Sequence, residues 1–218
     1  MASIPPTSVP VYDLGHRGDF DYTLIDKMLR MTPQQRLEHH ERWRGLLKRG
    51  AMLPNFVKEI VERLQAGGVE FIVVGGVGAI LQGATVNTMD LDICYRRTPQ
   101  NIAHLVAALA PLNPRPRGFP PDLPFVFDER TVQLGSNFTL EIGPESLDLL
   151  GVMSAIGGYE QVIDGALDAQ LDTLTVKTLS LEQLITTKTA AGRRKDLATI
   201  PELQATLERK RQQNNPSP

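Results

Sequence analysis

Two aspartates stand two residues apart in the segment Met89-Asp90-Leu91-Asp92-Ile93. On a β-strand, residues with this spacing point to one face, and the three apolar residues point to the other. Two carboxylates held side by side resist ionising together unless a cation lies between them, and hard oxygen ligands suit Mg²⁺ or Mn²⁺. The pair therefore predicts a divalent metal site, although an isolated Asp-x-Asp is more often a solvated strand face.

A glycine pair, Gly75-Gly76, ends an almost wholly apolar run at residues 69–74, which predicts a strand buried on both faces. Glycines at this point let backbone N–H groups approach phosphate oxygens, and the N-terminus of a short helix expected at 77–82 adds partial positive charge. A phosphate site beside a paired-carboxylate metal site is the minimum equipment for phosphoryl or nucleotidyl transfer. A tight turn that needs small residues is the alternative, but it leaves the carboxylates unexplained.

Two further charged residues interrupt apolar patterns. Asp148 lies in the run 147–150, where a buried unpaired carboxylate would be costly, so a metal ion or an ion pair should compensate it. Lys188 continues the stripe of Leu181, Leu184 and Ile185, so we expect a covered stem and an ammonium at a pocket edge or in solvent. Asp196 is a candidate N-cap for the last helix.

The remaining elements follow from hydrophobic periodicity and turn residues. Helices are expected at 32–49, 55–65, 99–109 (capped by Thr98), 159–168, 181–188 (opened by a capping box at Ser180) and 195–210, the last broken or kinked at Pro201. Strands are expected at 69–74, 89–95, 130–134, 138–142, 147–150 and 174–178. The proline-rich segment 111–124 is expected to be a stiff loop.

Composition narrows the function classes. A net charge of −2 and a pI near 6.1 give no global attraction to nucleic acid, so any such contact depends on local basic patches. A single cysteine, Cys94, excludes an internal disulfide and a cysteine-rich zinc site. No run approaches the roughly 18 apolar residues of a membrane span, and the first residues lack a secretory pattern. We therefore expect a cytoplasmic protein without membrane contact.

Taken together, Gly75-Gly76 and Thr88-Met89-Asp90-Leu91-Asp92-Ile93 resemble the signature of the DNA polymerase β superfamily of nucleotidyltransferases. Within it, the chain looks most like the bacterial AbiEii-like and MenT-like group. Ser146-Leu147-Asp148-Leu149-Leu150 fits the third-carboxylate strand of that group, and the segment from Lys188 to Arg193 fits its Lys-x-x-Ala-Gly-Arg-like helix. The similarity covers roughly residues 56–207, and only the combination of motifs is specific.

This resemblance implies a fold and a domain organisation. The fold is α/β (α+β by a stricter count), with a nucleotidyltransferase-type mixed sheet, flanking helices and a helical C-terminal part. Residues 1–50 are expected to form an N-terminal arm and helix, residues 51–210 the nucleotidyltransferase-like domain, and residues 211–218 a disordered tail.

It also implies an activity. The enzyme would transfer an NMP from an NTP to an acceptor hydroxyl with Mg²⁺ (or Mn²⁺) and release pyrophosphate. The expected catalytic residues and metal ligands are Asp90, Asp92 and Asp148, and the expected nucleotide-binding residues are Gly75, Gly76, Thr88, Lys188 and Arg193. Val86 replaces an Arg of many relatives, and Gly76 replaces a Ser of other branches, so fewer phosphate contacts are expected.

The acceptor and the partners follow from the resemblance and from local charge. RNA, chiefly tRNA, is the expected acceptor, as in a toxin-antitoxin system with a cognate antitoxin, and a protein hydroxyl or a small molecule is the alternative. Candidate phosphate-contacting residues are Arg115, Arg117, residues 193–195 and the basic residues of 42–49.

Three other functions compete with nucleotidyl transfer. A dinucleotide-binding turn is disfavoured because Leu81 stands where a third small residue belongs and no ribose-binding acid follows. A P-loop enzyme is disfavoured because the chain lacks G-x-x-x-x-G-K-[ST]. A catalytically degenerate nucleotidyltransferase fold that acts as a binding or antitoxin-like partner is the non-enzymatic alternative.

Overall fold

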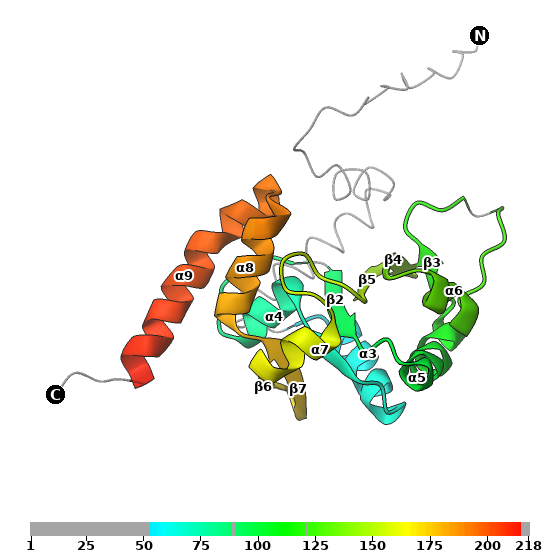
Figure 1. The fold of residues 1–218 in the computed structure, drawn as a ribbon, viewed down its shortest axis with the longest axis horizontal. Helices are drawn as coiled ribbons and strands as arrows, with labels where there is room; N and C mark the ends of the chain where they lie inside the picture. The colour runs from blue at the N-terminus through cyan, green and yellow to red at the C-terminus, as the bar shows by residue number, and fades with distance from the viewer. Residues whose placement is uncertain (1–52, 89, 121, 215–218) are drawn as a thin grey trace, which may run out of the picture.

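The computed structural model describes residues 53–88, 90–120 and 122–214 (Figure 1). The arm and helix expected within residues 1–50 lie outside these ranges. Within them, one mixed sheet of seven strands is flanked by helices, with a helical C-terminal part. The predicted α/β fold is therefore confirmed. No helix in these ranges combines the length and hydropathy that a membrane span requires.

The sheet has the strand order β3-β4-β5-β2-β1-β7-β6. The strands are β1 (Phe71–Val73), β2 (Asp90–Tyr95), β3 (Arg115–Pro116), β4 (Asn137–Ile142), β5 (Glu145–Leu150), β6 (Ala166–Leu171) and β7 (Leu174–Leu179). Parallel pairing joins β2 to β5 and β1 to β7, and every other neighbouring pair is antiparallel. The central strands β5, β2 and β1 thus come from three separate parts of the sequence.

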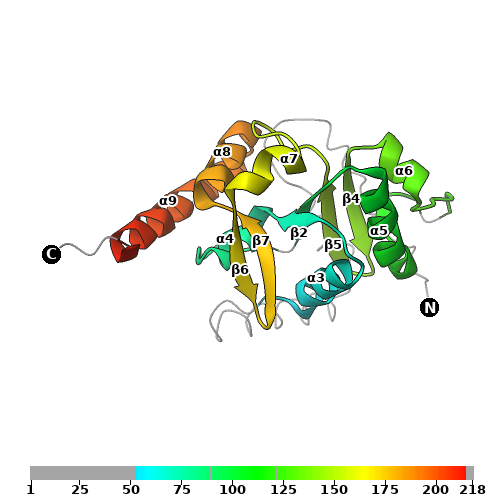
Figure 2. The same cartoon turned by 60° about the horizontal axis from the view of Figure 1, so that its bottom comes forward.

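Helices cover both faces of this sheet (Figure 2). The helices are α3 (Asn55–Ala66), α4 (Gly75–Leu81), α5 (Pro99–Leu109), α6 (Glu129–Leu134), α7 (Tyr159–Val162), α8 (Leu181–Ala191) and α9 (Arg194–Asn214), with 3-10 turns at Ala110–Leu112 and Ile163–Gly165. One core contains α3, α5 and α6 residues, and the second contains α4, α7, α8 and α9 residues. Strand alternation divides the apolar residues between the two cores.

The alternation along β2 fixes the orientation of the carboxylates. Leu91, Ile93 and Tyr95 are fully buried in the α3/α5 core, whereas Cys94 belongs to the α4/α8 core. Asp90 and Asp92 have the same parity as Cys94, so they point to the face that α4, α8 and α9 cover. The sequence pattern therefore placed both carboxylates correctly on one side of the strand.

Two expectations about elements are wrong. Residues 130–134 belong to helix α6, because Asp128 caps it by accepting a 2.7 Å hydrogen bond from the Thr131 N–H. The helix expected at 159–168 stops after one turn, and the chain enters β6 at Ala166. Strand β6 then forms a hairpin with β7, in which Asp172 adopts a left-handed conformation with φ +56°.

The C-terminal part is a pair of helices, α8 and α9 (Figure 1). Ser180 and Gln183 form the predicted capping box at the start of α8, and Gly192 ends it with φ +64°. Helix α9 then runs without a break through Pro201 to Asn214, so it takes in residues 211–214 that we expected in the tail. Leu203 of α9 and Leu184 of α8 are buried in the same core, which fixes the pair against the sheet.

Candidate active site

Three carboxylates meet on neighbouring strands at the centre of the sheet. In the parallel pairing of β2 with β5, Asp92 lies opposite Asp148 and Asp90 lies opposite Ser146. Paired residues in a sheet point to the same face, so all three carboxylates lie on the α4/α8 side. The structure thus brings together the three residues that sequence analysis assigned to catalysis and metal binding.

Their proximity makes ionisation costly. Burial, and after it the charges of Asp148 and Asp90, raise the pKa of Asp92 to about 7, against the opposing effect of Lys188 and Lys195. Burial also raises the pKa of Asp148, although the Arg117 charge opposes this effect. Two neighbouring acids with raised pKa values are a site that favours an added cation.

The glycine pair lies directly against these carboxylates. Gly75 has φ +60°, and a Cβ at this position would collide with the carboxylate of Asp92. A Cβ on Gly76 would collide with the side chain of Thr88. Glycine is therefore required at both positions of this turn.

Thr88 has a local structural contact. Its hydroxyl donates a 3.2 Å hydrogen bond to the carbonyl of Asp90, and its side chain packs against Gly76. Thr88 therefore links the glycine turn to the first carboxylate strand. Its expected role in nucleotide binding stays a prediction.

Arg117, which the sequence indicated only as an RNA contact, is a residue of this site. Its Nη2 atom lies 3.5 Å from Oδ1 of Asp90 and 3.6 Å from Oδ1 of Asp148. Its backbone N–H donates to the carbonyl of Thr139, which pairs with Asp148, which pairs in turn with Asp92. Arg117, the residue after β3, therefore ends a row that crosses β4, β5 and β2, and only the register reveals that row.

Lys188 forms an ion pair, which corrects the expectation of a free ammonium at a pocket edge. Its Nζ lies 3.0 Å from Oδ1 of Asp196, and Nε of Arg193 lies 2.6 Å from Oδ2 of the same carboxylate. Burial raises the pKa of Asp196, but hydrogen bonds from Arg193 and Lys188 outweigh it and the net shift is downward. Asp196 is the third residue of α9 and not its N-cap, so that expectation is also wrong.

These contacts change the interpretation of the α8–α9 connection. The two carboxylate oxygens of Asp196 are shared between one cation from α8 and one from the α9 start. The charge of Lys188 still reaches the carboxylate site, because it lowers the pKa of Asp92. Lys195 acts on both Asp92 and Asp148 in the same direction. The start of α9 therefore contributes positive charge beside the carboxylates.

The oxygen atoms of these carboxylates are donors of the kind that a divalent cation prefers. Asp148 Oδ1 is buried without a hydrogen bond, and Asp92 lies among like charges, so hard oxygen donors with excess negative charge are present. Within the described ranges no three His, Cys, Asp or Glu side chains are arranged to hold one metal ion. The Arg117 guanidinium lies between Asp90 and Asp148. The chemistry of the donors fits Mg²⁺ or Mn²⁺, and binding would require these side chains to rearrange.

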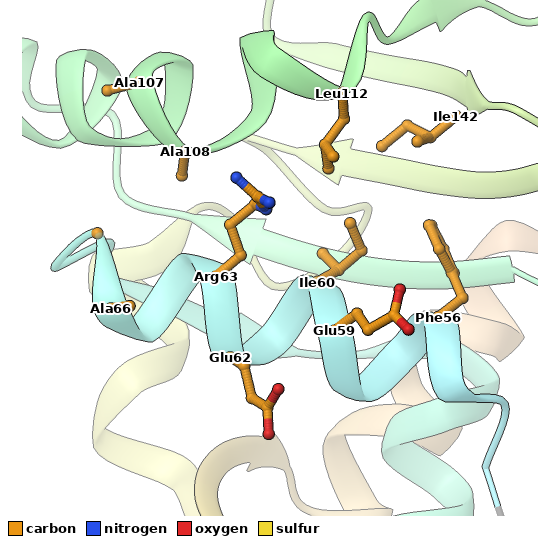
Figure 3. Close-up of a pocket in the computed structure, with 11 residues that line it drawn as sticks. Phe56, Glu59, Ile60, Glu62, Arg63, Ala66, Ala107, Ala108, Leu112 and Ile142 are labelled. Atoms are coloured by element: carbon orange, nitrogen blue, oxygen red, sulfur yellow. The ribbon is translucent and has the colours of Figure 1, made fainter.

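A separate groove lies on the other face of the sheet, between α3 and α5 (Figure 3). It has a volume of about 770 Å³ and a mainly apolar lining that includes Phe56, Ile60 and Leu112. Glu59 also lines it, and the Arg63 side chain points from α3 toward Ala108 of α5 (Figure 3). Because α3 and α5 cover the face opposite the carboxylates, this groove is not part of the candidate active site.

None of the protein-family models matches the chain, and no curated protein matches it. Two similar solved structures both cover 70% of this chain. One is the solution structure of the antibiotic-resistance factor ANT(2″)-Ia, with 16% identity, a TM-score of 0.48 and 83% of that chain covered. The other is the crystal structure of ANT(2″)-Ia in complex with adenylyl-2″-tobramycin, with 15% identity, a TM-score of 0.48 and 88% of that chain covered.

Both structures are of an aminoglycoside nucleotidyltransferase. Similarity at this level does not assign an activity to the present chain. Neither comparison bears on the AbiEii-like and MenT-like group, so that resemblance stays a prediction.

Proposed function

We propose that this protein is a nucleotidyltransferase that transfers an NMP from an NTP to an acceptor hydroxyl. The observation that carries the proposal is the row of carboxylates on β2 and β5 directly beside the glycine turn. Asp92 pairs with Asp148 across the two strands, and the backbone of Gly75 is in contact with the carboxylate of Asp92. A triphosphate bound at the turn would therefore lie next to the carboxylates.

In this proposal Asp90, Asp92 and Asp148 hold Mg²⁺ or Mn²⁺. The bound cation would neutralise triphosphate charge and lower the pKa of the attacking hydroxyl. The acceptor oxygen forms a bond to the α-phosphorus of the NTP, the bond to pyrophosphate breaks, and pyrophosphate leaves. Asp148 is suited to accept the hydroxyl proton, because burial raises its pKa and its Oδ1 has no hydrogen bond.

Positive residues around the carboxylates would contact the triphosphate. Lys195 is the best supported of them, because its charge acts on both Asp92 and Asp148. Lys188 is held by Asp196 and would act at longer range or after exchanging partners. Arg193 has a side chain that is 64% exposed, so it can reach a ligand from the rim while Asp196 anchors it.

We further propose that the acceptor is RNA, with tRNA as the first candidate and a toxin-antitoxin system as the context. This part rests on the sequence resemblance and on the local positive charge at the start of α9. A protein hydroxyl is the competing acceptor.

The direct test is to incubate the full chain with each radiolabelled NTP, Mg²⁺ or Mn²⁺, and total RNA or lysate. Label should enter a macromolecule with the wild type and be lost with Asp92→Asn. Asp164→Asn is a matched control, because Asp164 is exposed and lies in the 3-10 turn Ile163–Gly165. Absence of label from all four NTPs with either metal would contradict the proposal.

One observation favours a second function, a non-catalytic fold that binds a partner. Arg117 already supplies positive charge to Asp90 and Asp148, as a structural ion pair would. The two functions differ in metal-dependent NTP binding. A binding module should show no rise in its unfolding midpoint with Mg²⁺ and NTP, whereas an enzyme should show one by mass action.

A further inference from the structure

The position of Arg117 carries an inference about how the carboxylate site is controlled. Its Nη2 atom is close to Oδ1 of both Asp90 and Asp148, at 3.5 and 3.6 Å. These carboxylates come from two neighbouring parallel strands, so the guanidinium bridges β2 and β5. The Arg117 side chain is only 21% exposed, which weakens the screening of its charge by water.

The bridge is an electrostatic contact without hydrogen bonds. Arg117 Nη2 and Asp148 Oδ1 are both buried, and neither has a hydrogen-bond partner. Both contact distances exceed the 2.7–3.2 Å of an ordinary N–H···O bond. A guanidinium that forms close, paired bonds with carboxylates is held firmly, and this one is not. The contact supplies charge without fixing the side chain.

The backbone of Arg117 is anchored independently of its side chain. Its N–H donates a 2.9 Å hydrogen bond to the carbonyl of Thr139. The neighbouring Arg115 donates to the carbonyls of Pro120 and Leu123, and its guanidinium lies over the ring of Phe119. The loop is therefore held by Arg115 and by β3–β4 pairing. The Arg117 side chain can leave the carboxylates without unfolding this segment.

We propose that Arg117 neutralises the charges of Asp90 and Asp148 while no divalent cation is bound. A divalent cation that binds to these carboxylates must then displace the Arg117 guanidinium. This inference rests on the proposed function for the identity of the metal ligands. It adds that the apparent metal affinity is set by competition with a residue of the chain itself. The guanidinium lies between two of the three carboxylates that would hold the metal.

The test is Mn²⁺ binding to the full chain, measured by the electron paramagnetic resonance signal of free Mn²⁺ without nucleotide. Arg117→Met keeps the apolar stem and removes the charge. It should bind Mn²⁺ at least about tenfold more tightly than the wild type. The reason is that a positive charge this close to the carboxylates, in a partly buried site, strongly repels a bound cation. Arg130→Met is the control for loss of one positive charge, because Arg130 is exposed on α6. This control should leave the affinity unchanged.

A second measurement tests the charge-balancing role. In EDTA, Arg117→Met should unfold at a lower temperature than the wild type. In a separate series without EDTA, added Mn²⁺ should raise the unfolding midpoint of Arg117→Met by more than it raises the midpoint of the wild type. If Arg117→Met does not fold, Arg117→Gln replaces it, because the amide keeps a polar group at this position without the positive charge.

The outcomes separate this inference from the proposed function. Equal or weaker Mn²⁺ binding by the charge-free variant, with clear binding by the wild type, overturns the displacement and leaves the metal site intact. No Mn²⁺ binding by either protein overturns both the displacement and the metal-dependent reaction. Tighter binding by the Arg130→Met control as well would assign the effect to net charge, and this also overturns the displacement.

Discussion

At the scale of single residues, Asp92 bears the largest electrostatic cost of the site. It lies opposite Asp148, and the backbone of Gly75 is packed against its carboxylate. Burial and the two neighbouring aspartates raise its pKa from 3.8 to about 7. The folded protein therefore binds a proton between these two pH values that the unfolded chain releases.

This shift predicts how stability depends on pH in EDTA. The contribution of protonated Asp92 to the unfolding free energy is fully present below about pH 4. It is lost as the pH rises through 7, because the Asp92 carboxyl ionises at a lower pH in the unfolded chain than in the folded protein. Asp92→Asn should therefore match the wild type near pH 4 and exceed it at pH 8 by about 1 to 4 kcal/mol of unfolding free energy, at about 1.4 kcal/mol per pKa unit. Urea denaturation at pH 4, 5, 6, 7 and 8 measures the difference.

Asp164→Asn provides the comparison for this experiment, since it also removes one carboxylate but from an exposed turn. If the difference in unfolding free energy between the wild type and Asp92→Asn does not change as the pH rises, Asp92 has an ordinary pKa and the prediction is wrong.

The residues of the site differ in how far the sequence predicts them. Asp90 and Asp92 were predicted from their spacing on one strand face, and Asp148 was predicted because it interrupts an apolar strand. Arg117 follows a proline in an apparent loop, and its role depends on the pairing of Thr139 with Asp148. Register between strands distant in sequence leaves no local signal, so the residue could not be predicted.

At the scale of elements, Asp196 is the electrostatic link between α8 and α9. It is 4% exposed, with Lys188 on one oxygen and Arg193 on the other. Removing the charge of a buried carboxylate that pairs with two cations leaves both cations without a compensating negative charge. The packing of Leu184 against Leu203 does not replace that charge.

We therefore expect Asp196→Asn to lower the unfolding free energy by about 2 to 4 kcal/mol at pH 7. Its control is Asp168→Asn, which breaks the exposed Lys177–Asp168 pair at 2.8 Å and should cost about 0 to 1 kcal/mol. Because the pKa of Asp196 is lowered, the stabilisation is present above the ordinary value of 3.8 and is lost on acidification below it. Thermal or urea unfolding at pH 7 and pH 3 checks both claims, and equal costs for the two variants would contradict the linking role.

The elements that sequence analysis missed have identifiable causes. The α6 segment has a β-branched residue and a leucine at strand-like spacing, but Asp128 caps a helix there. Residues 159–168 have helical spacing, yet Asp172 and Thr173 form a tight turn that pairs β6 with β7. In both cases a cap or a turn, and not the apolar period, decided the local structure.

At the scale of the whole molecule, the described cations are largely occupied by internal contacts. Arg117 lies at the carboxylates, Arg193 binds Asp196, and Arg209 and Arg211 of α9 bind Glu202 and Glu182. With a net charge of −2, the chain presents few positive groups to a polyanion. An RNA acceptor would therefore be held by a small number of phosphate contacts near the site.

This charge distribution predicts a moderate salt dependence if RNA is the acceptor. With roughly three phosphate contacts to a single-stranded end, the affinity for RNA should fall about 20-fold between 50 and 200 mM salt, since each contact contributes a slope of about −0.7 on logarithmic axes. Labelling rates at saturating NTP and subsaturating RNA measure this fall, and saturating NTP removes the effect of salt on nucleotide binding. The label should also be released by ribonuclease. Label that resists ribonuclease and changes little with salt would identify a protein hydroxyl as the acceptor, because neutral hydroxyl recognition releases few counterions.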